Sequence, residues 1–176
     1  MNRFKELYQQ DMARYRNKPT IYVKFLLFFL RKVQTTNNGL LKFIYKLFFR
    51  LLASSRGLEI SSVIKIGGGL YLGHAYNITI NPNAVIGKNC NLHKGLVIGQ
   101  QNRGKYKGTP TIGNNVWIGI NAAIVGKITI GDDVLIAPNS FVNCDVPSHS
   151  VVFGNPCIIK HRDYATEGYI NNTLDV

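Results

Sequence analysis

Histidine and cysteine are the residue types in this sequence that could move a proton near neutral pH, act as a nucleophile or bind a metal. The histidines are His74, His93, His149 and His161. The cysteines are Cys90, Cys144 and Cys157. The sequence has no HxxxH or CxxC pair, so we expect no metal site and no redox motif. An odd number of cysteines favours a reduced, cytoplasmic setting.

A polar, glycine-rich stretch at residues 99–110 carries a second group of chemically useful side chains. It contains Arg103, Lys105 and Lys107. These side chains offer positive charge to an anionic or polar substrate, and we expect them to bind it. A solvated connector without a binding role is the alternative for this stretch.

The elements that must position these side chains are indicated by a six-residue repeat of aliphatic residues. In the second half of the chain the repeat falls at Ile112, Ile118, Ile124, Ile130, Ile136 and Val142. Upstream it falls at Ile60, Ile66, Leu72 and Ile78, restarts two residues later at Ile80, and continues at Ile86, Leu92 and Ile98. Helices have a period of 3.6 residues and strands a period of two, so neither produces a period of six. A hexapeptide β-helix does.

In such a fold, each hexad forms one face of a triangular coil, and its leading aliphatic residue points into the prism. Three hexads make one coil, and successive coils pair through parallel ladders so that aliphatic residues stack on one another. Fourteen positions separate Ile98 from Ile112. This is two more than two hexads, so we expect residues 99–111 to leave the wall as a loop. The predicted domains are an arm at 1–56, the β-helix at 57–160 and a tail at 161–176.

The arm at residues 1–56 differs from the rest of the chain in charge and pattern. It holds twelve Lys and Arg against two acidic residues, whereas the whole chain has a formal net charge of +12. Its apolar runs at 21–31 and 40–52 predict two or three helices. They are shorter than the roughly 20 residues that span a bilayer and are interrupted by charges. A secretory signal peptide is also disfavoured, because the first apolar run begins late in the sequence.

Two interpretations of the arm remain open. Its helices pack on one another, on the end of the prism or on a partner subunit, with the basic residues solvated. Alternatively, an aromatic and basic face contacts the anionic inner leaflet of a membrane as a peripheral protein. We expect no specific binding of nucleic acid, because the basic residues alternate with apolar ones and no base-reading motif is present.

At this point the sequence resembles the hexapeptide-repeat acetyltransferases, in the serine acetyltransferase-like branch that includes polysaccharide O-acetyltransferases. The resemblance covers roughly residues 57–160. Its most specific segments are 65–75 (KIGGGLYLGHA), the loop, 115–119 (NVWIG) and 146–156 (VPSHSVVFGNP). It implies a mainly β fold, a left-handed parallel β-helix with an N-terminal helical arm.

The resemblance implies that His74 is the general base that takes a proton from an acceptor hydroxyl as the hydroxyl attacks a thioester. Glu59 stands fifteen positions earlier, where the family has an acidic residue, usually Asp, that orients the imidazole. A backbone amide, with Gly119 as a candidate, would stabilise the oxyanion. His93 follows one coil later and is expected to bind substrate or assist.

Two departures from the family concern the acceptor. Members that acetylate serine normally have Asp directly before the base, where this chain has Gly73, and a histidine before the proline of the loop, where it has Thr109. Both residues would help to hold a small amino acid. The resemblance therefore implies transfer to a sugar hydroxyl, most plausibly on a cell-surface or exported polysaccharide.

The donor implied by the resemblance is acetyl-CoA, lying in the cleft between neighbouring prisms of a homotrimer. The expected cofactor-binding residues are Trp117, Gly119, Ala137, Gly154, Asn155, Pro156, Lys160 and Arg162. The chain has Cys157-Ile158 where the family usually has Ala-Arg, so one phosphate contact differs. Two alternatives remain: a serine O-acetyltransferase of cysteine biosynthesis, and a non-catalytic trimeric scaffold.

Overall fold

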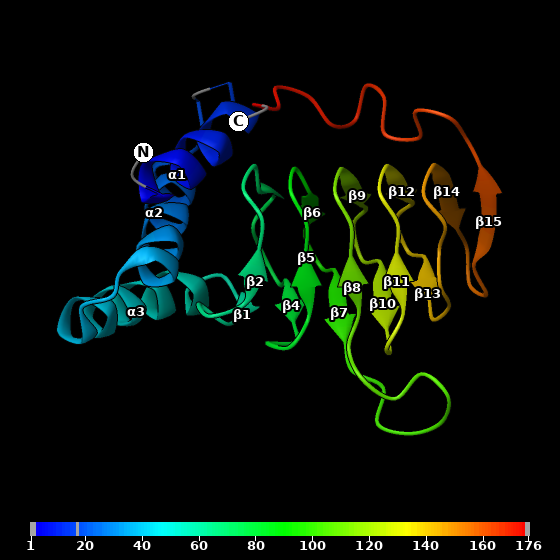
Figure 1. The fold of residues 1–176 in the computed structure, drawn as a ribbon, viewed down its shortest axis with the longest axis horizontal. Coiled ribbons are helices and arrows are strands. Elements are labelled where there is room, and N and C mark those ends of the chain that lie inside the picture. The colour runs from blue at the N-terminus through cyan, green and yellow to red at the C-terminus, as the bar shows by residue number, and fades with distance from the viewer. Residues whose placement is uncertain (1–2, 17, 175–176) are drawn as a thin grey trace.

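The computed structural model describes residues 3–16 and 18–174. Three helices come first in the chain: α1 (Arg3–Arg14), α2 (Ile21–Thr35) and α3 (Gly39–Ser54). They form a helical arm at one end of an elongated stack of short strands (Figure 1). Thr20 directly precedes α2, and its hydroxyl accepts a hydrogen bond from Val23 N at 3.3 Å. Asn38 directly precedes α3, and its side-chain oxygen accepts a hydrogen bond from Leu41 N at 3.0 Å. Both are N-caps that satisfy an otherwise unpaired amide of the first turn.

The strands form three sheets that run along the stack. The first sheet contains β1 (Glu59–Ile60), β4 (Thr79–Ile80), β7 (Val97–Gly99), β10 (Ala123–Val125) and β13 (Phe141–Val142). The second contains β2 (Lys65–Ile66), β5 (Val85–Ile86), β8 (Thr111–Ile112) and β11 (Thr129–Ile130). The third contains β3 (Tyr71–Gly73), β6 (Asn91–His93), β9 (Val116–Ile118), β12 (Val134–Ile136), β14 (Ser150–Phe153) and β15 (Ile158–His161).

Parallel pairing between successive coils places each leading aliphatic residue directly over another. In the third sheet, Leu72 pairs with Leu92, Leu92 with Ile118, and Ile118 with Ile136. These side chains are buried in the interior of the prism. The predicted left-handed β-helix with an N-terminal helical arm is confirmed.

The arm is joined to the first coil by a buried ion pair. Arg31 of α2 contacts Asp11 of α1 through two bonds, Nε to Oδ2 at 2.7 Å and a terminal nitrogen to Oδ1 at 2.9 Å. Both side chains are fully buried. Arg31 also donates to the carbonyl oxygens of Ile66 and Gly67, and Asp11 accepts from Leu70 N. These polar contacts fix the arm against the open end of the prism.

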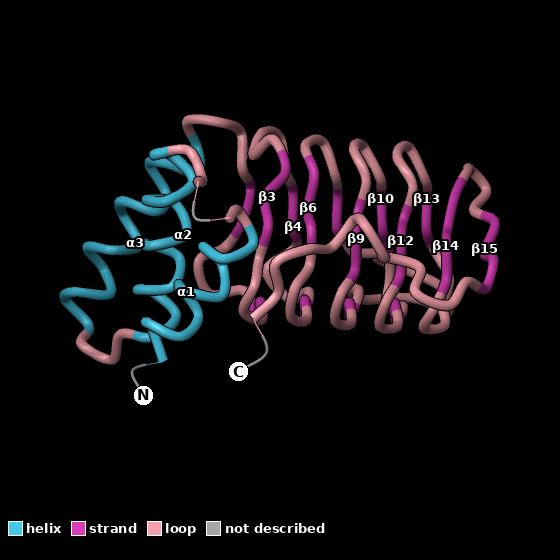
Figure 2. Tube along the Cα trace, turned by 90° about the horizontal axis from the view of Figure 1, so that it is seen from above, coloured by secondary structure: helices cyan, strands magenta, loops and turns pink. Residues whose placement is uncertain are grey.

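The C-terminal segment after β15 runs back along the outer face of the third sheet toward α1 (Figures 1 and 2). Asp133 accepts hydrogen bonds from Ala165 N and from the amide and hydroxyl of Thr166. Further along, Asn91 donates to the carbonyl of Tyr169 at 3.1 Å. The segment therefore forms a wall beside the third sheet.

Candidate active site beside the third sheet

His74 lies in the corner that leads from β3 to β4. The aliphatic repeat advances eight positions across this corner, from Leu72 to Ile80, whereas the corresponding corners from β6, β9 and β12 advance six. The two-residue shift of the repeat, from Ile78 to Ile80, therefore falls in the corner that contains His74. The backbone of His74 has a φ of 53°, and its side chain is exposed. A positive φ is uncommon for a non-glycine residue, but it recurs at the corners of other coils, as at Asn121 and Asn139, so it belongs to the corner geometry of this fold.

His93 of β6 packs against the residue that precedes His74. Gly73 and His93 are register partners in the third sheet. A Cβ atom at position 73 would lie 2.6 Å from His93 Nε2, closer than atoms in contact can approach. The imidazole of His93 thus occupies the space where the family's aspartate side chain would begin.

His93 is held as a neutral imidazole. Its Nδ1 lies 2.9 Å from the carbonyl oxygen of Ile118, so Nδ1 carries the proton and donates it to that oxygen. Burial lowers the pKa of His93 because it disfavours the charged ring, and repulsion from His74 lowers it further. His93 is therefore uncharged near neutral pH, with Nε2 as the nitrogen that can accept a hydrogen bond.

Aromatic rings from distant parts of the chain form a row on the outer face of this sheet. Tyr15 stacks on Tyr71 with ring centroids 4.6 Å apart, and Tyr71 is followed by His93 at 6.2 Å. His93 lies 4.6 Å from Trp117, which contacts the edge of Tyr169 at 5.2 Å. The row links the turn after α1, three coils and the C-terminal segment. It borders a pocket of about 420 Å³.

Glu59 lies in β1, the first strand of the coil that ends at the His74 corner. Its Oε2 accepts a hydrogen bond from the hydroxyl of Thr79 at 3.3 Å. In the described part of the chain, neither Glu59 nor any other residue forms a side-chain hydrogen bond to His74. The orienting role of Glu59 therefore stays a prediction. Glu59 also lines a pocket of about 320 Å³ beside Lys46 and Arg50 of α3.

Residues 100–110 project from the corner between β7 and β8, whereas Gly99 and Thr111, the ends of the expected loop at 99–111, remain in those strands (Figure 1). Gln101 and Gly108 pair across the base of this loop, with N to O distances of 3.0 and 2.9 Å. Lys127 N donates to the carbonyl of Tyr106 at 2.8 Å and ties the tip to the next coil. The three basic side chains are exposed there: Arg103, Lys105 and Lys107. The loop does not line the pocket of the aromatic row.

The residues expected to bind the cofactor lie along the later coils. Trp117 is half-buried in β9, and Gly119 and Ala137 follow β9 and β12. A Cβ atom at position 119 would lie 2.6 Å from Pro138 N, so the backbones of neighbouring coils approach closely here. The remaining members lie at and after the turn that follows β14 and are at least partly exposed: Gly154, Asn155, Pro156, Lys160 and Arg162.

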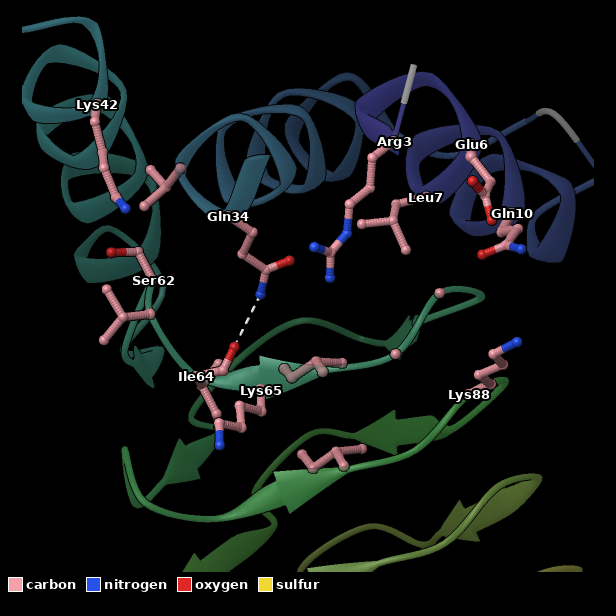
Figure 3. A pocket seen from close by; sticks show the side chains of 16 residues that line it. Arg3, Glu6, Leu7, Gln10, Gln34, Lys42, Ser62, Ile64, Lys65 and Lys88 are labelled. Atoms are coloured by element: carbon pink, nitrogen blue, oxygen red, sulfur yellow. Dashed lines mark hydrogen bonds between the residues drawn. The ribbon is translucent and has the colours of Figure 1, made fainter. Parts of the chain in front are cut away.

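Another pocket, of about 850 Å³, lies between the arm and the first coils (Figure 3). Gln34 lines this pocket, and its side-chain amide donates a hydrogen bond to the carbonyl oxygen of Ile64 at 2.9 Å. Its labelled side chains come from the arm and from the second sheet and its flanking turns, including Arg3, Lys65 and Lys88. None of the predicted site residues lines it.

Several residues of the candidate site were not anticipated from sequence. Arg14, Asn91 and Tyr169 border the pocket of the aromatic row. Arg14 and Tyr169 stand in the arm and the tail, where no repeat indicates a position in space. Asn91 differs, because it precedes a repeat position and so could have been placed on the outer face of a coil.

Among residues 3–16 and 18–174, no group of three or more His, Cys, Asp or Glu side chains is arranged to hold a metal ion. Within the same ranges, none of the helices combines the length and apolar character needed to cross a bilayer.

Comparison with known proteins relates this geometry to a family. The family model described as bacterial transferase hexapeptide (six repeats) matches residues 109–144. The serine acetyltransferase of Helicobacter pylori (strain ATCC 700392 / 26695) is 34% identical over 113 residues, 64% of this chain and 66% of that protein. The serine acetyltransferase of Synechococcus elongatus is 34% identical over 106 residues, 60% of this chain and 43% of that protein. The chain thus spans 43% to 66% of the length of these two relatives.

Solved structures agree with the fold. Soybean serine acetyltransferase in complex with serine has a TM-score of 0.76 at 22% identity, covering 91% of this chain and 70% of that one. The serine acetyltransferase of Neisseria gonorrhoeae in complex with serine has a TM-score of 0.68 at 26% identity, covering 89% and 69%. The chain is thus similar to hexapeptide-repeat acetyltransferases of the serine acetyltransferase-like branch.

Proposed function

We propose that this chain is an acetyl-CoA-dependent O-acetyltransferase in which His74 is the general base. The observation that carries the proposal is the enlarged corner at His74, where the imidazole is exposed at the edge of a coil. The β-helix to which this coil belongs has the same fold as serine acetyltransferases. A hydroxyl is a poor nucleophile until a positioned base removes its proton as it attacks the thioester carbonyl. The attack forms the new C–O bond, and collapse of the tetrahedral intermediate releases the CoA thiolate.

The test is release of free thiol from acetyl-CoA by the purified protein with a panel of hydroxyl acceptors. His74→Ala should lower the turnover rate by about 10²-fold or more, the range that loss of a general base produces. His161→Ala is the matched control, because its side chain is largely exposed on β15. Turnover in His74→Ala equal to that of the control would remove His74 from the mechanism.

The acceptor that we propose is a sugar hydroxyl of a cell-surface or exported polysaccharide. Gly73 supports this choice, because His93 fills the space in which an aspartate could hold the amine of serine. Thr109, in place of the family's histidine, removes a second contact to a small amino acid. Serine remains the alternative acceptor, and it is favoured by the names of the relatives. Thiol release with serine, compared with sugars and glycan fragments, separates the two.

A non-catalytic trimeric scaffold is the second candidate. Absence of acetyl-CoA binding at millimolar ligand, in a protein that remains folded and trimeric, would favour it. The catalytic proposal itself includes a homotrimer, because the CoA cleft of the family needs walls from two subunits. Sedimentation velocity tests this directly, and a monomer over the concentration range of the assay would contradict it.

We also propose that the arm contacts an anionic membrane surface through α3. This helix exposes a set of large apolar side chains: Leu40, Leu41, Phe43, Ile44, Leu47, Phe48 and Leu51. Lys42, Lys46 and Arg50 are exposed on the same helix at a spacing of four residues. The acidic residues within 1–56 are Glu6 and the buried, ion-paired Asp11. A basic rim around an apolar face complements anionic lipid, where each Lys or Arg near the surface contributes about 1 kcal/mol.

A second copy of the chain is a less favourable occupant of this face, because two equally basic arms repel each other. Flotation with phosphatidylglycerol vesicles, compared with phosphatidylcholine vesicles, tests the contact. Phe43→Glu with Leu47→Glu should abolish flotation, and Tyr164→Glu, an exposed aromatic of the tail, should not. Arm-dependent dimerisation without vesicle binding would contradict the proposal.

A further inference from the structure

The pocket of the aromatic row has walls from three separate parts of the chain. The C-terminal end of α1 and the residues after it form one wall, the outer face of the third sheet forms the floor, and the C-terminal segment forms the other wall. Its volume of about 420 Å³ lies in the range of ligand sites in proteins. The described residues that line it include three cations, Arg14, Arg16 and Lys18, and no Asp or Glu.

Arg14 is a buried cation that has no carboxylate partner among residues 3–16 and 18–174. The exposed fraction of Arg14 is 5%. Its guanidinium donates to the carbonyl oxygens of Gly69 and Asn171, both at 2.8 Å, and to Oδ1 of Asn91 at 2.6 Å. These acceptors are neutral, so the contacts within the described residues satisfy its hydrogen bonds without a direct ion pair. Buried charges in proteins are usually paired, and this one gives the pocket a positive potential.

Arg16 and Lys18 add two exposed cations at the mouth of the pocket. Within residues 3–16 and 18–174, neither side chain has a hydrogen-bond or ion-pair partner. An anionic group entering the pocket would therefore meet one buried charge and two available donors. The arrangement favours a ligand with a phosphate or a carboxylate.

The rest of the lining is suited to a sugar. Tyr71, Trp117 and Tyr169 present aromatic surface, on which the C–H face of a pyranose ring can pack. Asn91, Asn171 and Asn172 supply amides that can both donate to and accept from hydroxyl groups. Aromatic surface with a few convergent polar groups is typical of sites that orient a polar ligand.

The pocket also has a defined position relative to the proposed base. It extends along the third sheet from Tyr71 past His93 to Trp117, and the ring of His93 lies against Gly73, the residue directly before His74. The proposed acetyl-CoA residues after Trp117 lie on the opposite side of His93, toward β14 and β15. A ligand in the pocket would thus approach His74 from the arm side, while the donor approaches from the later coils.

We propose that this pocket binds the acceptor, a saccharide bearing a phosphate or a carboxylate, and directs one of its hydroxyl groups past His93 to His74. The identification of the ligand as the acetyl acceptor rests on the proposed acetyltransferase function. The binding site and its ligand class rest on the pocket alone.

Trp117 provides a direct readout, because it lines the pocket and is the single tryptophan of the chain. Titration with glucose 1-phosphate and with glucuronate should change its fluorescence saturably, and glucose should bind at least tenfold more weakly. The double variant Arg16→Ala, Lys18→Ala should weaken binding of both anionic sugars at least tenfold. Lys65→Ala, an exposed lysine on the second sheet, is the matched control. Arg14 is left intact because it ties α1 to the first coils.

Three outcomes would overturn the inference. Equal affinity for inorganic phosphate would indicate a plain anion site, and unchanged binding in the double variant would exclude the cations. Displacement of glucose 1-phosphate by CoA would assign the pocket to the donor. None of these measurements needs turnover, so failure of the acetyltransferase proposal, seen as no thiol release with any acceptor, is distinguishable from failure of the saccharide site.

Discussion

The ring of His93 lies where a side chain at position 73 would have to begin. A side chain at the position before the proposed base would therefore displace the ring of His93 in the next coil. This relationship connects the departure from the family's aspartate to the aromatic row and to the pocket. It also leads to the first prediction.

Gly73→Ala should displace His93 and loosen its stacking on Trp117. Strain of this kind costs about 1–3 kcal/mol. Urea denaturation should show lower stability, and the emission of Trp117 should shift. Gly39→Ala is the control, because nothing lies within 4 Å of a Cβ at that position in α3. Equal stability of the two variants would mean that His93 moves aside without cost.

Trp117 fluorescence should report the titration of His93, since a protonated imidazole quenches an adjacent indole. The lowered pKa of His93 places the midpoint below the ordinary value near 6.5. Removing the charge repulsion with His74→Ala should move the midpoint upward. A quenching midpoint at or above 6.5 in the unaltered protein would contradict the assigned environment.

The same shift has a consequence for stability. The unfolded chain binds a proton at His93 more readily than the folded chain does, so stability increases with pH through this range. Unfolding free energy should therefore decrease as the pH falls from about 7 toward 5, and His93→Gln should flatten that dependence. Urea titrations at several pH values measure both slopes.

Asp11→Ala should be strongly destabilising, by about 3–5 kcal/mol, because it leaves Arg31 charged and unpaired in the interior. The arm should detach from the first coil before the β-helix unfolds, visible as separate helical and sheet transitions by circular dichroism. Asp163→Ala removes an exposed contact to His161 and should have little effect. A small effect of Asp11→Ala would show that the arm is held mainly by apolar contacts.

Glu59→Gln tests the predicted orienting role. If Glu59 aligns His74 during turnover, the variant should lower kcat by up to about 10⁴-fold with little change in KM, as loss of a carboxylate behind a catalytic histidine does. Glu59→Asp, the residue usual in the family, should retain most of the activity. Equal activity of the Gln variant and the unaltered protein would leave Glu59 as a partner of Thr79 alone.

Asp133 should control the attachment of the C-terminal segment. Although burial raises its pKa, hydrogen bonds from Thr166, His149 and Ala165 outweigh this and leave the pKa below its usual value. Its stabilising contribution is complete above the unfolded pKa near 3.9 and is lost as the pH falls through the folded value. Asp133→Asn should speed amide exchange at Ala165 and Thr166, measured by mass spectrometry. Unchanged exchange would mean that other contacts hold the segment.

The six-residue repeat determined the coil and its stacked core, because one buried aliphatic position per face is sufficient to specify a prism. The repeat also located the loop and the irregularity at Ile80, although only the structure showed that this irregularity enlarges the corner of His74. The charge and apolar runs of the arm indicated helices. They could not indicate how those helices meet the coil.

The pocket was decided by tertiary structure alone. Its aromatic row brings together Tyr15, Tyr71, His93, Trp117 and Tyr169. The two outer members come from segments without a repeat, and their positions depend on long-range contacts such as the Arg31–Asp11 pair and the bonds from Thr166 to Asp133. Local periodicity carries no information about such contacts, because they join residues far apart in the chain through single side chains.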